Sequence, residues 1–218
     1  MIYHNISQEQ LVTLVTQAVQ AELQKRSRQV PVGISVRHIH LTRADVDKLF
    51  GYGYQLTPKK ALSQPGQFAC EECLDVIGPK GELKRVRILG PERSSTQIEL
   101  AQTDCRTIGV NASVRSSGDT KGTPGVTLRG PLGELTVPEG VIVADRHLHM
   151  TPAQAAAFGL ADGDRVQIRI DGIKPGIMGG VLVRANSKCA LDFHIDTDDG
   201  NAFLLRQGQL VTVLGKEE

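Results

Sequence analysis

The stretch "VRHIHLTRADV", from Val36 to Val46, is repeated in "DRHLHMTPAQA", from Asp145 to Ala155. Both contain the sequence Arg-His-x-His-x-Thr, and together they hold four of the six histidines in the chain. Each follows an apolar, strand-like segment, and each threonine stands where a helix N-cap is expected. The repeat therefore predicts two related units, each with a strand, a pair of histidines and a short helix.

The spacing within each histidine pair indicates a shared function. Alternate residues of an extended strand point to the same side, so His38 and His40 share a face, as do His147 and His149. A single His-x-His is weak evidence for a metal ligand, and a duplicated surface segment without function is the alternative. Two copies in matching context, together with His194 in "LDFHID", favour metal binding. Imidazole ligands suit zinc or a related transition metal, and the scarcity of nearby sulfur points to open, catalytic coordination.

Composition excludes several classes of protein. The chain has 218 residues, of which 40% are hydrophobic, so it can bury a core without disulfides. A net charge of +1 gives no electrostatic sign of a nucleic-acid partner, and no apolar run approaches the length of a bilayer span. Four cysteines make no disulfide framework, which indicates a reducing compartment. Cys70 and Cys73 form a lone CxxC, weak evidence for a metal site, and we expect half-buried thiols; His4 is expected to be incidental.

The first thirty residues predict one amphipathic helix. From Ser7 to Lys25 the apolar residues recur at helical spacing, and Ser7 with Gln10 has the pattern of a capping box. The stripe consists of Leu11, Val15, Ala18, Val19 and Leu23. The following "KRSRQ", from Lys25 to Gln29, is typical of a solvated linker.

Beyond Val30 the chain reads as strands and tight turns. "IGPKGEL" at Ile77–Leu83 and "RGPLGEL" at Arg129–Leu135 share a Gly-Pro-x-Gly turn that is typical of a hairpin. No strand is followed in regular alternation by an amphipathic helix, which argues against a doubly wound α/β sheet. We therefore predict a mainly β fold: two small β-barrel domains related by an internal repeat, with short capping helices and an N-terminal amphipathic helix.

Five stretches carry a resemblance to a known family. They are "GISVRHIHLTRADVDKLFG", "GPERSSTQIEL", "VRSSGD", "VIVADRHLHMTPAQAAAFGL" and "FHIDTDDGNAF". Together they resemble the PduL-type phosphate acyltransferases (phosphate propanoyltransferase) over nearly everything from Val30 onward. The resemblance implies two β-barrels with a two-zinc site between them and a non-sequential domain arrangement. The implied parts are a targeting or association helix and linker over 1–29, a first barrel from 30–36 with 145–218, and a second barrel from 37–144.

The resemblance also implies roles for individual residues. The first zinc ion would be held by two histidines and a carboxylate, with the coenzyme A sulfur able to fill a fourth position, and the second by three histidines and waters. The first set is His38, His40 and Glu99, and the second is His147, His149 and His194. Arg93 matches the phosphate-binding arginine of the family. Coenzyme A contacts fall on Ser35, Lys60, Arg87, Leu89 and Asn201, and substrate contacts on Gln67 and Ser117.

The activity implied is the exchange of a short acyl group, propanoyl or acetyl, between coenzyme A and inorganic phosphate. Because the sequence shows no Ser-His-Asp or Cys-His arrangement that would require an acyl-enzyme, we expect direct attack by phosphate. Two alternatives stay open: a two-metal thioester hydrolase, in which water replaces phosphate, and a non-catalytic metal-binding scaffold component.

The resemblance further implies a cellular context. Members of the family found in bacterial microcompartments, such as those of propanediol degradation, carry a leader helix that directs them to the shell or cargo. We therefore expect acyl-coenzyme A and phosphate as substrates, and microcompartment shell or cargo proteins as partners through the N-terminal helix. We also expect a homo-oligomer in the microcompartment lumen or otherwise in the cytoplasm, with no nucleic-acid or membrane partner.

Overall fold

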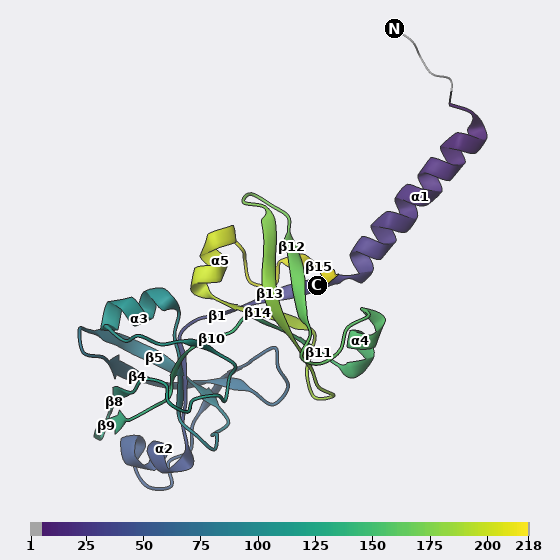
Figure 1. Ribbon diagram of the computed structural model, residues 1–218. Helices are drawn as coiled ribbons and strands as arrows, with labels where there is room; N and C mark the ends of the chain where they lie inside the picture. Colours follow the sequence, from purple (N-terminus) through teal and green to yellow (C-terminus); the bar gives the residue numbers. More distant parts are fainter. Residues whose placement is uncertain (1–5, 218) are drawn as a thin grey trace.

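The strands form two sheets, and each histidine repeat contributes to a different one (Figure 1). The computed structural model describes residues 6–217. The first sheet is a closed barrel in the order β1-β14-β11-β13-β12-β15. Its strands are β1 (Gln29–Ser35), β11 (His147–Met150), β12 (Arg165–Ile170), β13 (Gly176–Ala185), β14 (Asp192–Asp196) and β15 (Leu210–Lys216), with helices α4 (Pro152–Ala157) and α5 (Thr197–Phe203).

The second sheet has nine strands and curls into a half-barrel. Its order is β7-β10-β6-β2-β5-β4-β8-β9, with β3 paired to β4. The strands are β2 (His38–His40), β3 (Pro58–Ala61), β4 (Phe68–Ile77), β5 (Glu82–Gly90), β6 (Gln97–Glu99), β7 (Val114–Arg115), β8 (Val126–Gly130), β9 (Gly133–Val137) and β10 (Val141–Ala144). Helices α2 (Arg43–Phe50) and α3 (Gln102–Ile108) belong to this part of the chain. The prediction of a mainly β fold built on two barrel-like sheets with short helices is confirmed, with the difference that only the first sheet closes into a complete barrel.

The barrel is closed by a strand from the other end of the chain. Val32 of β1 pairs in parallel with Phe193 of β14, and Gln29 pairs in the antiparallel sense with Thr212 of β15. The two Gly-Pro-x-Gly motifs form the predicted hairpins, between β4 and β5 and between β8 and β9. The strands divide between the two sheets along the predicted parts, 30–36 with 145–218 and 37–144. That these parts are separate domains stays a prediction.

Each sheet has its own apolar core, and the two cores determine where the histidines point. Ile39 and Leu148, the central residues of the two His-x-His motifs, are both fully buried in their cores. Burying a side chain of this size contributes about 1.5–3 kcal/mol. Because side chains alternate along a strand, the flanking histidines face away from the core in both units.

The threonine of each repeat caps the helix that follows it. Thr42 Oγ1 accepts from the Asp45 amide at 3.1 Å, and Thr151 Oγ1 accepts from the Gln154 amide at 3.2 Å. The second helix also has the reciprocal bond of a capping box and a proline in its first turn. The strand–histidine–helix organisation predicted for both repeats is therefore confirmed.

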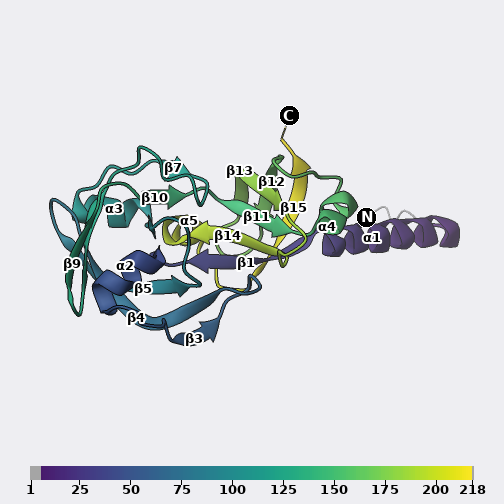
Figure 2. The same cartoon turned by 90° about the horizontal axis from the view of Figure 1, so that it is seen from below.

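Helix α1 (Gln8–Ser27) extends away from the barrel on the side opposite the nine-stranded sheet (Figures 1 and 2). The predicted capping box is present, since the Ser7 amide donates to Gln10 Oε1 and the Gln10 amide to Ser7 Oγ. Every side chain described from Ile6 to Ser27 is exposed, and Val12 and Leu14 widen the predicted apolar stripe. None of the helices within the described range combines the length and apolarity needed to cross a bilayer.

The predicted solvated linker from Lys25 to Gln29 is wrong. The helix continues to Ser27, and Gln29 is already the first residue of β1. Arg28 joins the two elements to the barrel, because its Nε donates to the Val213 carbonyl at 3.0 Å and its Nη2 to the Phe158 carbonyl at 3.1 Å. Lysine and arginine are good helix formers, so a charged composition does not by itself indicate a linker.

Candidate metal centre

The first predicted ligand set is assembled by the pairing of two short strands. His38 of β2 lies opposite Glu99 of β6 in the antiparallel register, and all three residues of the set are buried. His38 Nε2 is 3.4 Å from Glu99 Oε2, and His40 Nε2 is 3.7 Å from Glu99 Oε1. His38 Nδ1 lies 2.8 Å from the Val36 carbonyl, a contact in which the ring must donate. The Nε2 lone pair of a neutral His38 is therefore left for another partner.

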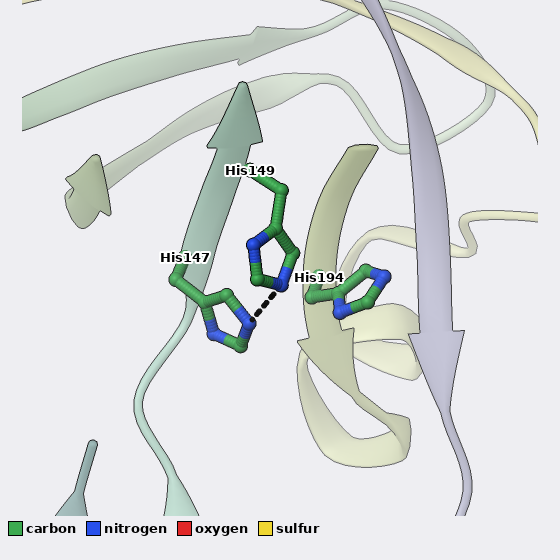
Figure 3. A group of neighbouring side chains, drawn as sticks. All are labelled: His147, His149 and His194. Atoms are coloured by element: carbon green, nitrogen blue, oxygen red, sulfur yellow. Dashed lines mark hydrogen bonds between the residues drawn. The ribbon is translucent and has the colours of Figure 1, made fainter. Parts of the chain in front are cut away.

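The second predicted set is assembled in the same way in the barrel (Figure 3). His147 of β11 lies opposite His194 of β14, and the three rings converge. His147 Nδ1 is 2.7 Å from the Asp145 carbonyl, while its Nε2 is 3.1 Å from His149 Nε2. His194 Nε2 is 2.9 Å from Asp192 Oδ2, which leaves His194 Nδ1 as its free nitrogen.

Both sets fit a metal ion by their donor chemistry. The ligand atoms of each set lie within 4.8 Å of one another. A tetrahedral ion with Zn–N bonds of about 2.0–2.1 Å holds its ligands roughly 3.4 Å apart. In the second set, the His147 proton is committed to a backbone carbonyl, so its Nε2 faces that of His149 as a lone pair. An ion bound there would take the place of the proton that a neutral His149 can donate in this contact (Figure 3), and three imidazoles would leave coordination positions open for substrate.

The buried environment keeps most of these imidazoles neutral. Burial is the main cause that lowers the pKa of His40 and His149 to about 3 and of His147 to about 4. For His38 burial also acts to lower the pKa, but the charge of Glu99 and a hydrogen bond to it outweigh burial and raise it. Burial would raise the pKa of Glu99, but the charge and hydrogen bond of His38 hold it well below the usual range. Neutral imidazole and ionised carboxylate are the forms that bind metal.

Arg93 is linked to the first ligand set through a serine. Its Nη1 donates to Ser117 Oγ at 3.0 Å, and that hydroxyl donates to Glu99 Oε1 at 3.0 Å. Arg93 also lines a cavity of about 310 Å³ whose other walls are Pro65, Gly66, Gln67, Gly90 and Pro91. The structure therefore brings Gln67 and Arg93 to one cavity, and connects Arg93 to the first ligand set through Ser117.

The residues predicted to contact coenzyme A are spread over both sheets. Arg87 of β5 lies beside His38 in the parallel register, and its Nη1 donates to the Cys70 and Glu71 carbonyls. Leu89 follows two residues later on the same strand, and Lys60 is exposed on β3, which pairs with β4. In the barrel part, Ser35 ends β1 and Asn201 lies exposed in α5.

Arg184 is a residue near the metal centre that the sequence analysis missed. It lies beside His149 in the parallel pair of β11 and β13. Its positive charge helps to lower the pKa of His147, His149 and Arg93, so it lies close to the three-histidine set and to the cavity arginine. Its side chain makes no ion pair with an acid among residues 6–217. In the sequence, Arg184 is marked only as a charged residue near the end of the apolar, strand-like stretch "VLVRA".

The cysteines and the remaining histidine complete the set of candidate groups. Cys70 is buried and Cys73 half-buried, and neither belongs to a group of potential metal ligands among residues 6–217. Cys189 was missed: its Sγ is 3.5 Å from His149 Nδ1, a Cys-His contact that the sequence did not reveal. Residues that are distant in sequence form this contact, which no local motif announces. His4 lies outside the described residues.

Comparisons of the sequence with known proteins identify the family of the chain. The sequence pattern of the family described as phosphate propanoyltransferase matches residues 31–206. The phosphate propanoyltransferase of Thermotoga maritima is 45% identical over 194 residues, covering 88% of this chain and 92% of the relative. That of Salmonella typhimurium is 48% identical over 178 residues, covering 81% and 84%. That of Shewanella putrefaciens is 46% identical over 205 residues, covering 94% and 96%. The chain belongs to the phosphate propanoyltransferase family of acyltransferases.

Proposed function

We propose that the protein transfers a short acyl group, propanoyl or acetyl, between coenzyme A and inorganic phosphate at a two-zinc centre. The observation that carries the proposal is the presence of two ligand sets, the first of which is linked through Ser117 to an arginine that lines a cavity. His38, His40 and Glu99 would hold one ion, and His147, His149 and His194 the other. When bound, zinc supplies a Lewis acid that stabilises negative charge on the thioester oxygen or the departing thiolate.

The reaction is a nucleophilic substitution at the thioester carbonyl. A phosphate oxygen forms a bond to the carbonyl carbon, the carbon–sulfur bond breaks, and coenzyme A leaves as a thiolate, giving an acyl phosphate. The reverse reaction follows the same path. Arg93 binds and orients phosphate, since its planar fork matches two phosphate oxygens. Ser117 accepts from Arg93 and so fixes one end of the guanidinium. Holding both substrates together removes much of the entropic barrier.

Direct attack by phosphate is supported by the state of the nearest thiol. Burial is the main cause that raises the pKa of Cys189 above its usual value, so the unreactive thiol form prevails at neutral pH. His149 also has a strongly lowered pKa because of burial, which makes it a poor base toward the Cys189 thiol. The Cys189–His149 contact therefore lacks the activation that an acyl-enzyme mechanism requires.

Coenzyme A is the larger substrate, and we propose contacts at Ser35, Lys60, Arg87, Leu89 and Asn201. Lys60 and Arg87 supply positive charge for its diphosphate and ribose phosphate. Gln67 and Ser117 are proposed substrate contacts. The coenzyme A sulfur is proposed to reach the ion held by His38, His40 and Glu99, which would place the leaving group beside a Lewis acid.

A coupled assay tests the proposal. Acetyl-, propionyl- and butyryl-coenzyme A are supplied with and without phosphate to protein whose metal content has been measured. Phosphate-dependent release of coenzyme A with formation of acyl phosphate is expected. Thioester consumption that does not need phosphate would support a two-metal hydrolase. Metal-loaded protein that turns over no thioester would support a non-catalytic scaffold component.

We also propose that α1 directs the enzyme to a bacterial microcompartment by docking on shell or cargo proteins. The helix has a capped start and an apolar stripe in which Leu11, Val15 and Val19 are each a little over half exposed. A single helix of 20 residues is only marginally stable alone, so an apolar partner would stabilise it. Self-association into a homo-oligomer is the competing use of the same stripe.

Removing residues 1–27 separates these uses from catalysis. The deletion stops before Arg28, because the Arg28 side chain donates to the Val213 and Phe158 carbonyls and so helps to hold the barrel part together. We expect acyl transfer to be retained and encapsulation to be lost, and we expect Met1–Ser27 fused to a fluorescent protein to enter microcompartments in a host that makes them. Diffuse fluorescence with a smaller oligomer in the truncated enzyme would instead favour self-association.

A further inference from the structure

The two repeats place a polar residue at the same position beside the third ligand of each set. In the nine-stranded sheet, His38 lies opposite Glu99 and His40 opposite Gln97. In the barrel, His147 lies opposite His194 and His149 opposite Asp192. Gln97 and Asp192 are thus equivalent: each precedes the third ligand by two residues, on the same strand face.

Gln97 is fixed so that it donates to Glu99. It is 1% exposed, and its Oε1 accepts from the Gly118 amide at 2.7 Å. That bond defines which end of the side-chain amide is oxygen. Its Nε2 therefore points at Glu99 Oε1, 2.6 Å away, and also lies 2.9 Å from Ser117 Oγ. A carboxylate ligand can only accept, so a donor is the group that can hold it in place.

Asp192 accepts a hydrogen bond from its ligand, whereas Gln97 donates one. It is 3% exposed, and its Oδ2 accepts from His194 Nε2 at 2.9 Å. An ionised carboxylate fixes the proton of the ring on Nε2 and leaves the Nδ1 lone pair directed at the other two histidines. Ser63, from the loop of the other sheet, lies 3.4 Å from the same Nε2. His194 is therefore held by groups from both halves of the molecule.

The neighbouring strand leaves room for this contact. Gly33 of β1 is in register with His194. A methyl group at Gly33 would lie 2.6 Å from His194 Cδ2 and 2.9 Å from both carboxylate oxygens of Asp192. The imidazole and the carboxylate thus pack directly against backbone, which restricts both to one arrangement.

We propose that Gln97 and Asp192 are matched positioning residues, each of which orients the third metal ligand of its own repeat through a hydrogen bond whose direction suits that ligand. A donor amide serves the carboxylate, and an acceptor carboxylate serves the imidazole. This inference rests on the proposed two-metal centre. Partners of this kind typically contribute about 10- to 100-fold to metal affinity.

Zinc affinity of each set measured separately tests the proposal. In a His38→Ala/His40→Ala background only the three-histidine set binds, and Asp192→Ala is expected to weaken zinc binding there by about 10- to 100-fold in competition with a chromophoric chelator. Asp192→Asn keeps an acceptor oxygen and should recover part of the loss. In a His147→Ala/His149→Ala background, Gln97→Glu, which replaces the donor by a second acceptor, should weaken the other set by a similar factor.

Two controls separate positioning from general damage. Asp75→Asn removes a carboxylate charge on β4 that pairs with Lys84 on β5, and should leave zinc affinity unchanged at both sets. The visible absorption of the cobalt-substituted protein should change in Asp192→Ala at the three-histidine set alone and in Gln97→Glu at the other set alone.

The outcomes distinguish this inference from the proposed function. Unchanged zinc affinity and cobalt spectra in Asp192→Ala and Gln97→Glu would overturn the positioning role while the metal centre stands. Parent proteins that bind no zinc would overturn the metal centre and this inference with it. If Asp192→Ala does not fold, Asp192→Asn decides the matter, since affinity equal to that of its parent would overturn the role of the carboxylate.

Discussion

Gln64 and Ala190 exchange two hydrogen bonds that join the two halves of the molecule. Gln64 Nε2 donates to the Ala190 carbonyl at 3.1 Å, and the Ala190 amide donates to Gln64 Oε1 at 3.2 Å. Gln64 is 5% exposed and belongs to the loop between β3 and β4, whereas Ala190 precedes β14. The side-chain amide thus acts as a short strand partner for the backbone beside Cys189, next to the three-histidine set.

Replacing Gln64 by alanine should lower the free energy of unfolding. The Ala190 amide and carbonyl would lose their partners in a partly buried place, at a cost of about 1 kcal/mol. Urea denaturation checks this prediction. Gln55→Ala is the matched control, because that exposed side chain bonds only to the nearby Gly53 carbonyl. Equal effects of the two substitutions would show that Gln64 does not join the halves.

Metal content should follow the two ligand sets independently. We expect up to two zinc ions per chain in purified protein, measured by elemental analysis. Replacing His38 and His40 together should remove one ion and abolish turnover, and replacing His147 and His149 should remove the other. Active protein that contains no metal would contradict the assignment of both sets.

Substitution of Arg93 should affect phosphate far more than acyl-coenzyme A. A charged bidentate contact to phosphate contributes roughly 1.5–3 kcal/mol, so Arg93→Ala should raise the KM for phosphate about tenfold or more. Arg93→Lys should restore only part of the affinity, because the planar fork is lost. Steady-state kinetics with each substrate varied in turn measures both effects. An equal rise in both KM values would mark Arg93 as a structural residue.

Cys189→Ser should keep phosphate-dependent turnover, because direct attack needs no thiol nucleophile. The substitution retains a small polar side chain beside His149 Nδ1, where Sγ now lies 3.5 Å away. Mass spectrometry of wild-type protein mixed with acyl-coenzyme A in the absence of phosphate should find no acylated peptide containing Cys189. Loss of turnover in the serine variant together with an acyl adduct would establish a covalent mechanism.

The metal-free protein should lose stability as the pH falls from 6.5 toward 4. The pKa values of His40, His147 and His149 are lowered, mainly by burial, to about 3 to 4 in the folded chain, against 6.5 when unfolded. Between these values the unfolded chain binds more protons than the folded chain, so acid favours unfolding and the stability is fully present above pH 6.5. The raised pKa of His38 acts in the opposite direction, because protonation of this one side chain favours the folded chain.

Urea midpoints of metal-free protein at pH 7.5 and pH 5 measure the effect. A His147→Gln/His149→Gln variant is the control and should show a smaller difference between the two conditions, since two of the depressed groups are gone. A midpoint that rises on acidification would contradict the neutral state of the buried imidazoles.

The local organisation of both repeats could be predicted because each part depends on neighbouring residues. Alternation placed Ile39 and Leu148 in the cores and turned the histidines away from them, and Thr42 and Thr151 cap the helices as expected. The membership of each ligand set was harder to predict, since Glu99 and His194 reach the His-x-His pairs only through strand pairing. His194 was a candidate ligand from the sequence itself, whereas Glu99 and the grouping of the ligands into two sets came from the family resemblance.

Contacts between distant segments could not be predicted from the sequence. Arg184 and Asp192 reach the centre because β13 and β14 flank β11, a topology that no local pattern reveals. Cys189 meets His149 through the loop before β14. The end of α1 was also misplaced, because the choice between helix and linker at Arg26–Arg28 depends on bonds that Arg28 makes to the barrel.

The pairing of β1 with β14 and β15 has a consequence for synthesis on the ribosome. The strand made first cannot find its partners until almost the whole chain has emerged, whereas β2 to β10 pair among themselves. Non-local pairing of this kind is slow and leaves strand edges exposed in the meantime. We expect the middle of the nascent chain to fold first, while β1 waits as an unpaired segment that a chaperone or a neighbouring nascent chain can bind. Val30 and Val32, fully buried in the finished barrel, would then be exposed for longer than any other part of its core.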